Sequence, residues 1–101
     1  MNYKSIMLPD AKNDLREATK WYGLANQKLG KKFIEQVRER VRQLKQNPYV
    51  CQIRYKDVRG AMVKQFPYII FYIINENKKA IEIFAISHTS RNPQIWKGRI
   101  K

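Results

Sequence analysis

The stretch FPYIIFYIINENKKAIEIFAISHTSRNP, residues 66–93, contains the segments that decide the fold. Residues 68–74 are apolar at all seven positions, which is typical of a central strand covered on both faces. Residues 75–78 carry turn signals, and the apolar alternation of residues 80–88 predicts a final strand. The stretch then ends in polar residues and an arginine. The sequence therefore predicts a buried hairpin that leads into a cationic tail.

Strict alternation assigns the side chains of the last strand to two faces. Ile83 and Ala85 are expected on one face. Phe84 and Ile86 are expected on the other face, together with His88. Because His88 then shares its face with apolar side chains, we favour a structural role for it, as a hydrogen-bonded residue at the edge of the core, over a catalytic role.

Two amphipathic helices are expected before these strands. Residues 3–8 resemble a weak first strand, and Pro9 suits the first turn of a helix. Apolar residues then recur in alternating steps of four and three, at Ala11, Leu15, Ala18, Tyr22 and Ala25. A second stripe consists of Leu29, Phe33, Val37, Val41 and Leu44. Residues 26–28 are expected to form the turn between the helices. Asn47-Pro48 ends the second helix, since the residue before a proline disfavours helix.

The remaining segments complete the order of elements. Residues 52–56 alternate as a strand, residues 57–60 are expected to turn, and residues 61–66 form another strand. A chain of 101 residues is expected to form one domain, 1–101. The predicted fold class is α+β, in the order β-αα-ββββ or βααβββ, with the two-helix hairpin packed on a small sheet.

Charge is the strongest global property of the chain. The formal net charge is +13, and residues 1–50 and 51–101 contribute +6 and +7 of it. Such a charge directs a protein toward nucleic acid, the ribosome, an anionic membrane surface or an acidic protein, with a merely solvated basic surface as the alternative. No run of about 18 apolar residues is present, so no membrane span is expected. The single cysteine, Cys51, cannot form an intrachain disulfide and suits a reducing cytoplasm.

Four cations around the predicted turn form the first candidate site. Arg54 and Lys56 share one face of a predicted strand, Arg59 follows in the turn, and Lys64 lies in the next strand. Spaced cations on a sheet can hold a phosphate backbone and stabilise the charge that develops during phosphodiester cleavage. The alternative is a solvated sheet edge, where Lys and Arg prevent pairing with another chain. The sequence gives these two interpretations equal weight.

His88 and Arg91 form the second candidate site, at the end of the last strand. A histidine there can act as general acid or base, and a neighbouring arginine can hold phosphate. Trp96 and Arg99 follow in the tail, where Trp96 either folds back onto the domain or docks a partner. With one histidine, one cysteine and eight acidic residues, no metal site and no cofactor are expected.

A series of short motifs extends over nearly the whole chain. They are Ala11-x-x-Asp14-Leu15, Trp21-Tyr22, Leu29-Gly30-x-x-Phe33, Leu44-x-x-Asn47-Pro48, Val58-Arg59, Phe66-Pro67-Tyr68-x-Ile70-x-Tyr72 and His88-x-x-Arg91-x-Pro93-x-x-Trp96. Their order and spacing resemble the RelE/ParE superfamily of bacterial type II toxins. The last two motifs look most like the ParE-like branch, although Asn92 stands where that branch often has an aspartate.

The resemblance implies an α+β fold with a helical hairpin against an antiparallel sheet. It also implies a toxin whose partner is a cognate antitoxin. RelE-like members cleave mRNA on the ribosome without a metal, whereas ParE-like members poison DNA gyrase. For RelE-like cleavage the candidate catalytic residues are Arg59, His88, Lys56 and Lys64. For contact with RNA or another target the candidates are Arg54, Arg91, Trp96 and Arg99.

Three classes of function therefore compete. The first is a toxin that acts as a metal-independent, ribosome-dependent endoribonuclease. The second is a toxin that poisons DNA gyrase by binding it. The third is a non-toxic, basic nucleic-acid-binding module. We expect a cytoplasmic toxin that inhibits growth and is neutralised by its antitoxin. The sequence leaves open whether the target is the ribosome or gyrase, and whether the chain forms a homodimer or a toxin–antitoxin hetero-oligomer.

Overall fold

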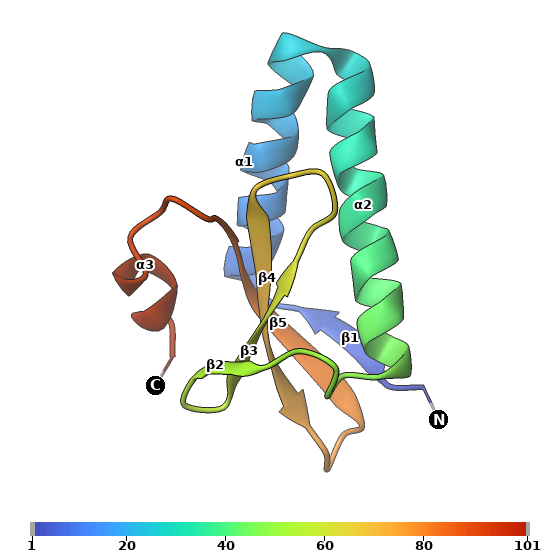
Figure 1. The fold of residues 1–101 in the computed structure, drawn as a ribbon, viewed down its shortest axis with the longest axis vertical. Coiled ribbons are helices and arrows are strands. Elements are labelled where there is room, and N and C mark those ends of the chain that lie inside the picture. The colour runs from blue at the N-terminus through green and yellow to red at the C-terminus, as the bar shows by residue number, and fades with distance from the viewer. Residues whose placement is uncertain (1, 101) are drawn as a thin grey trace.

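The chain folds as a strand, a helical hairpin and four further strands, followed by one short helix (Figure 1). The computed structural model describes residues 2–100. The elements are β1 (Lys4–Met7), α1 (Pro9–Ala25), α2 (Gln27–Gln46), β2 (Ile53–Tyr55), β3 (Val58–Met62), β4 (Tyr68–Asn75), β5 (Ala80–His88) and α3 (Gln94–Lys97). The α+β class and the order β-αα-ββββ are confirmed, and α3 is an addition to them. None of the described helices is both long and apolar enough to cross a membrane.

The helical hairpin turns through a single residue. Asn26 ends α1 by donating its backbone N–H to the carbonyl of Tyr22, and its side chain begins α2 by accepting from the N–H of Lys28 at 2.9 Å. The turn is therefore shorter than the predicted 26–28. The helices approach closely beside it: a Cβ on Gly30 would lie 3.2 Å from the Cα of Gly23. A glycine at this position allows the tight crossing.

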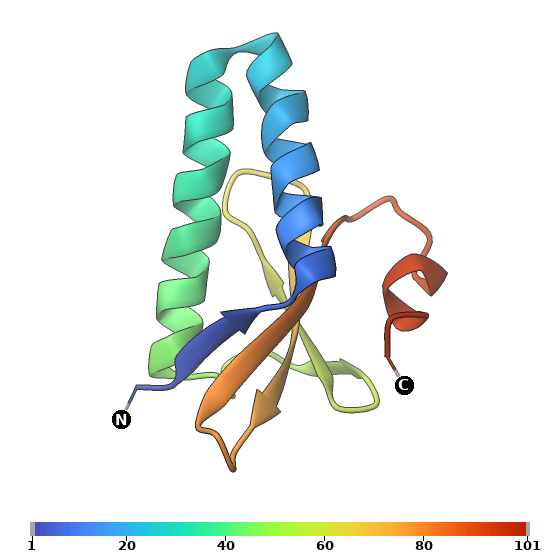
Figure 2. The ribbon, with the colours of Figure 1, turned by 180° about the vertical axis from the view of Figure 1, so that it is seen from behind.

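The five strands form one mixed sheet in the order β1-β5-β4-β3-β2. The strands β2 to β5 are antiparallel neighbours, as predicted. The expectation of a wholly antiparallel sheet fails for β1, which pairs with β5 in parallel (Figure 2). Most of the chain separates β1 from β5, so no tight turn forces the two strands into opposite directions. The N–H of Leu8 continues the pairing by donating to the carbonyl of Ile83 at 2.8 Å.

The hairpin of β2 and β3 differs from its prediction. The turn lies at residues 56–57, and β3 begins at Val58, so the predicted turn at 57–60 and strand at 61–66 are both wrong. Lys56 adopts a φ of 51°, a left-handed conformation that two-residue hairpin turns usually assign to glycine or asparagine. The sequence carries no such residue at the real turn. Gly60, which suggested a turn, lies inside β3 instead.

A β-bulge changes which side chains of β5 share a face. Phe71 is paired with Ala85 and Tyr72 with Ile83, which leaves Phe84 without a partner. Strict alternation fails at that point. Ile83 and Ile86 both belong to the core under the helices, whereas Phe84 and Ala85 both belong to the opposite core. The predicted grouping of Ile83 with Ala85, and of Phe84 with Ile86, is therefore wrong.

The two faces of the sheet carry separate cores. The inner face packs under α1 and α2, where the buried Tyr72 donates its hydroxyl to the carbonyl of Pro48 at 2.7 Å. The outer face packs under the tail, where Trp96 stacks on Phe71 with ring centroids 4.0 Å apart. Of the two interpretations of Trp96, the structure selects folding back onto the domain, because this side chain is only 7% exposed.

Candidate functional site

A cleft of about 480 Å³ lies between α1 and the end of β5. One wall is a helical stripe with the i, i+3, i+4, i+7 spacing that places side chains on one face, namely Asp14, Glu17, Ala18 and Trp21. The other wall consists of Tyr68, Ile86, His88, Ser90 and Arg91. The cleft exists because β1 ends at Met7, so the last part of β5 has α1 rather than a strand beside it.

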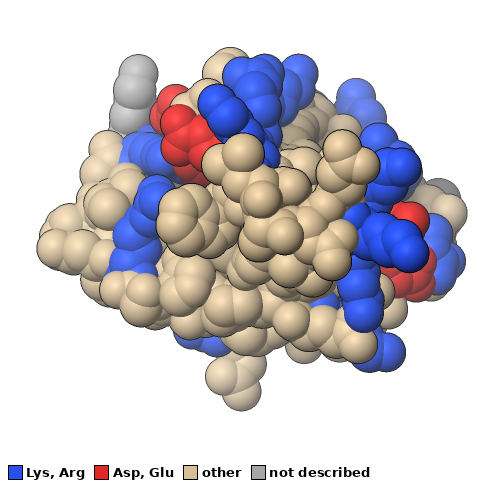
Figure 3. Space-filling model, turned by 90° about the horizontal axis from the view of Figure 1, so that it is seen from above, with Lys and Arg blue, Asp and Glu red and all other residues tan. Residues whose placement is uncertain are grey.

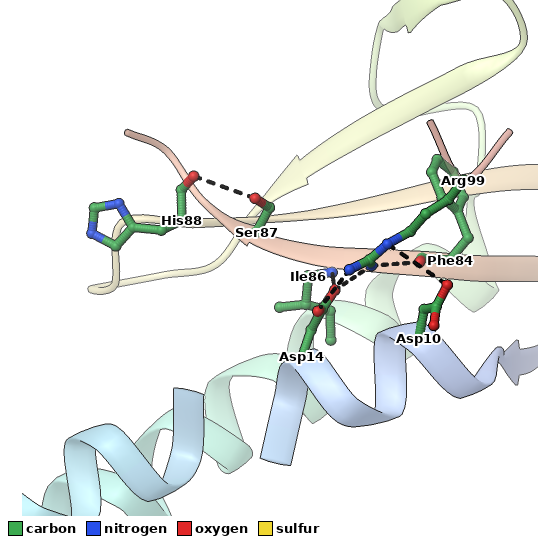
Figure 4. Close-up of polar contacts among 7 residues, drawn as sticks. All are labelled: Asp10, Asp14, Phe84, Ile86, Ser87, His88 and Arg99. Carbon is green, nitrogen blue, oxygen red and sulfur yellow. Dashed lines mark hydrogen bonds and ion pairs between the residues drawn. The ribbon is translucent and has the colours of Figure 1, made fainter. Parts of the chain in front are cut away.

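Asp14, which lines the cleft, forms an ion pair with Arg99 that links α1 to the tail (Figure 4). The Asp14 carboxylate accepts from Arg99 at 2.6 and 3.1 Å and from the backbone N–H of Ile86 at 2.9 Å. Arg99 also donates to the carbonyl of Phe84 at 3.1 Å. The two side chains thus satisfy backbone groups that a neighbouring strand would otherwise pair. The hydrogen bond and charge of Asp14 raise the pKa of Arg99.

His88 presents a single, defined hydrogen-bonding group. Its Nδ1 accepts the backbone N–H of Ser90 at 3.0 Å and lies 2.8 Å from the Ser90 hydroxyl. Because a backbone N–H can only donate, Nδ1 carries no proton, and the neutral ring holds its hydrogen on Nε2. The ring packs edge-on against Tyr68, and Figure 4 shows it pointing away from the Asp14–Arg99 pair. His88 is therefore a half-exposed hydrogen-bond donor and not a core residue.

The upper part of the cleft carries exposed recognition groups. Trp21 is 71% exposed, and Arg91 is exposed on the opposite wall. Burial raises the pKa of the Tyr68 hydroxyl, and this protonated hydroxyl is a further donor. Figure 3 shows uncharged side chains spread over the hairpin end of the molecule, with Lys and Arg gathered around them. Exposed Trp, Tyr and Arg are the side chains that dominate protein interfaces.

Sequence reasoning missed most of this cleft. Only His88 and Arg91 among the predicted site residues line it. Trp21 was an available signal, because it is a large apolar residue that lies off the buried stripe of its helix, next to Tyr22. The ion pair of Asp14 with Arg99 could not be predicted from any local sequence pattern, since the two residues are 85 positions apart.

The other predicted catalytic residues lie away from His88. Arg59 donates to the carbonyl of Cys51 at 2.5 Å and lies over the ring of Tyr49, with 5.1 Å from its guanidinium carbon to the ring centroid. Arg59 is opposite Tyr72 on β4, whereas His88 is opposite Tyr68. Four residues along a strand separate these positions by about 13 Å. Arg59 is thus held in a structural contact, far from the cleft.

The remaining predicted residues are also separated. Lys64 lies in the connection between β3 and β4, in a shallow pocket beside α2. Lys56 lies in the β2–β3 turn and Arg54 is exposed on β2. Trp96 and Arg99 are both engaged in contacts within the chain. The structure therefore places His88 and Arg91 in one cleft, and Arg59, Lys56 and Lys64 do not line it.

A groove runs along the outer side of the hairpin. Two adjoining hollows share Leu15, and their apolar floor includes Ile34, Val37 and Val41. Every charged side chain that lines these hollows is a cation, namely Lys12, Arg16, Lys20, Arg38, Arg42 and Lys45. The groove thus combines an apolar floor with a cationic rim.

Comparison with known proteins assigns the family. A family model described as the ParE toxin of the type II toxin–antitoxin system, parDE, matches residues 6–93. The chain belongs to the ParE toxin family. The resemblance of its motifs to the RelE/ParE superfamily is thereby confirmed, and this ParE-family chain is a toxin of a type II toxin–antitoxin system. No curated protein matches it closely enough in sequence to count as a relative.

Solved structures of toxins share the fold of this ParE-family chain. The chromosomal ParDE system from P. aeruginosa has a TM-score of 0.74 at 18% identity, covering 87% of this chain and 97% of that one. A double mutant of the E. coli toxin RelE in the free state has a TM-score of 0.74 at 16% identity, covering 100% of both chains. The intact E. coli RelBE complex has a TM-score of 0.68 at 16% identity, covering 88% and 99%. At these identities the likeness concerns the fold.

Proposed function

We propose that this toxin inhibits growth in the cytoplasm by binding DNA gyrase, rather than by cutting mRNA on the ribosome. One observation carries the proposal: of the four candidate catalytic side chains, only His88 lines the cleft. Cleavage of a phosphodiester needs an acid or base and charge-stabilising groups around one phosphate. Here Arg59 is about 13 Å along the sheet from His88. In addition, the Nδ1 of His88 is occupied by Ser90 and its Nε2 carries a hydrogen, so the ring offers no free lone pair as a base.

The cleft between α1 and β5 is the proposed contact surface for gyrase. It offers an exposed aromatic ring on Trp21, a guanidinium on Arg91, and donors on His88 and Tyr68. A tryptophan that is exposed in the free protein and buried in a complex contributes about 2 kcal/mol or more to affinity. Trp21 is held on α1, Tyr68 at the start of β4 and His88 at the end of β5, which reduces the entropy lost on binding.

Induction in a sensitive bacterium tests the target. We expect incorporation of labelled thymidine to fall before incorporation of labelled amino acids, with intact mRNA. Trp21→Ala should raise the Kd for purified gyrase about 30-fold, equivalent to the ~2 kcal/mol of one aromatic hot spot. Leu24→Ala is the matched control, since Leu24 is 77% exposed on the same helix and does not line the cleft. An early fall in protein synthesis with fragmented mRNA would refute the gyrase proposal.

Substitution of His88 separates binding from acid–base chemistry. Glutamine keeps an N–H donor but cannot exchange a proton, so the binding proposal expects His88→Gln to remain toxic and His88→Ala to be weakened. A general acid or base would be lost equally in both variants. Thymidine incorporation after induction is the measurement.

The cationic groove on the helical hairpin is the proposed binding surface for the antitoxin. Its apolar floor and all-cation rim fit an acidic amphipathic helix. We propose a toxin–antitoxin hetero-oligomer, because a second copy of a chain with net charge +13 would meet the rim with repulsion. The double variant Arg16→Glu/Lys20→Glu should escape neutralisation by the cognate antitoxin. The equally charged Lys31→Glu/Lys32→Glu, outside the groove, should remain neutralised; equal behaviour of the two would exclude the groove.

A further inference from the structure

Two cations lie over the ring of Tyr55 next to the tail, outside both the cleft and the antitoxin groove. The ammonium of Lys97 lies 4.7 Å from the centroid of the Tyr55 ring, and that of Lys56 lies 5.4 Å from the same centroid. The two ammonium groups are therefore within about 10 Å of each other, the sum of those distances. With the exposed Arg54, the preceding residue of β2, these lysines form a group that we call the tail-side cationic patch.

The patch is held in place by its surroundings. The Tyr55 ring packs edge-on against the buried Trp96, so the platform under the two lysines is fixed by the outer core. Arg54 lies across Gly60, where a Cβ would come within 3.3 Å of the Arg54 Nε. Gly60 therefore leaves the space that the arginine uses.

The charges of the patch are available to a ligand. Within residues 2–100, none of the three side chains forms an ion pair or donates a hydrogen bond to another side chain. Their charges are therefore not neutralised by another side chain in the described part of the chain.

We propose that the tail-side cationic patch binds the phosphate backbone of duplex DNA. Phosphates follow each other at about 3.4 Å of helix axis along one strand, so two ammonium groups up to about 10 Å apart can contact phosphates of the same strand. The Tyr55 ring is occupied by the two lysines and Trp96, which leaves it unavailable for stacking on bases. The lysines would therefore contact phosphates through charge alone, independently of base sequence. This proposal does not depend on which protein binds in the cleft.

Salt dependence of DNA binding tests the proposal. The probe is a mixed-sequence duplex of about three helical turns, titrated by fluorescence anisotropy over a series of salt concentrations, with the wild type, Lys56→Gln/Lys97→Gln and the control Lys31→Gln/Lys32→Gln. Both double variants remove two charges. The slope of log K against log salt changes by about 0.9 for each phosphate contact on duplex DNA. We expect the patch variant to lose about 1.8 of that slope and the control to keep the slope of the wild type.

Three results would overturn the proposal. If both double variants lose the same slope, the net charge of the whole chain and not the patch attracts DNA. If poly-glutamate binds as tightly as the duplex and the patch variant weakens both equally, the patch recognises acidic protein instead. Single-stranded RNA of equal length tells which nucleic acid the same phosphate contacts prefer, and tighter binding of RNA than of duplex would also contradict the assignment to DNA. Circular dichroism of each variant confirms that the fold is retained.

Discussion

The inner and outer faces of the sheet are covered very differently. The inner face lies under two helices of 17 and 20 residues, whereas the outer face lies under the four residues of α3 and the chain that follows (Figure 1). Residues such as Phe33 and Tyr72 are completely buried on the inner side. On the outer side Trp96 is the main cover, and it belongs to a segment that is anchored by only a few contacts.

This difference separates the main source of stability from one proposed binding surface, the tail-side cationic patch. Burial of large apolar surface under the hairpin provides most of the folding free energy. The thin cover on the outer face leaves cations such as Lys56 accessible, whereas the cleft beside His88 is walled by α1. Binding surfaces often occur where local packing is thin, because those groups are not needed to hold the fold.

The largest predicted effect comes from the inner core. Phe33 is 0% exposed, and its ring centroid lies 5.0 to 5.2 Å from those of Tyr22, Phe66 and Tyr68. Phe33→Ala should lower the free energy of unfolding by about 3–5 kcal/mol, the transfer and cavity cost of removing a buried aromatic side chain. Urea denaturation followed by circular dichroism measures it. A loss below about 1 kcal/mol would show that the hairpin is not the main source of stability.

A smaller effect is expected from the outer face. Trp96→Ala should cost about 1.5–3 kcal/mol, the value of burying one large apolar side chain, because the tail can detach without opening the inner core. Hydrogen exchange should accelerate for the amides of residues 94–100 and stay slow in β4. If the variant were as destabilised as Phe33→Ala, the two faces would form a single cooperative core.

The smallest predicted effect on stability comes from a hydrogen-bonded cluster on the surface, around Glu76. Glu76, in the β4–β5 turn, accepts from the hydroxyls of Tyr3 and Tyr49 and from Lys79. These hydrogen bonds, first that of Lys79, lower the pKa of Glu76 from 4.5 to about 2. Its stabilising contribution is therefore complete above about pH 4.5 and is lost as the pH falls toward 2.

Glu76→Gln is the variant that checks this pH dependence. Thermal unfolding should show the wild type more stable than the variant at neutral pH, and the gap should close between about pH 4.5 and 2. The matched variant Glu35→Gln, an exposed carboxylate on α2 without an ion pair among residues 2–100, should show no such closing gap. A gap that stays constant with pH would mean that the hydrogen bonds from Lys79, Tyr49 and Tyr3 do not favour the ionised form of Glu76 in the folded state.

Local patterns were sufficient for the elements and for the family. The helical stripe through Phe33 and Val37, the apolar run of β4 and the alternation of β5 predicted the correct elements, because the contacts that stabilise them repeat within a few residues. The motifs around Tyr68 and His88 indicated the superfamily for the same reason: they are contiguous in sequence. The predicted position of the β2–β3 turn was wrong, since Lys56 adopts a left-handed conformation that usually indicates a glycine or asparagine.

The sequence by itself determined the α+β class, the helical hairpin, the central strands and membership of the toxin superfamily, since these follow from short-range periodicity and local motifs. Only the tertiary structure decided the parallel pairing of β1, the bulge at Phe84 and the ion pair of Asp14 with Arg99. It also decided which cations are free to bind. The physical reason is that packing brings together side chains from distant segments, and no periodicity within one segment records the position of another.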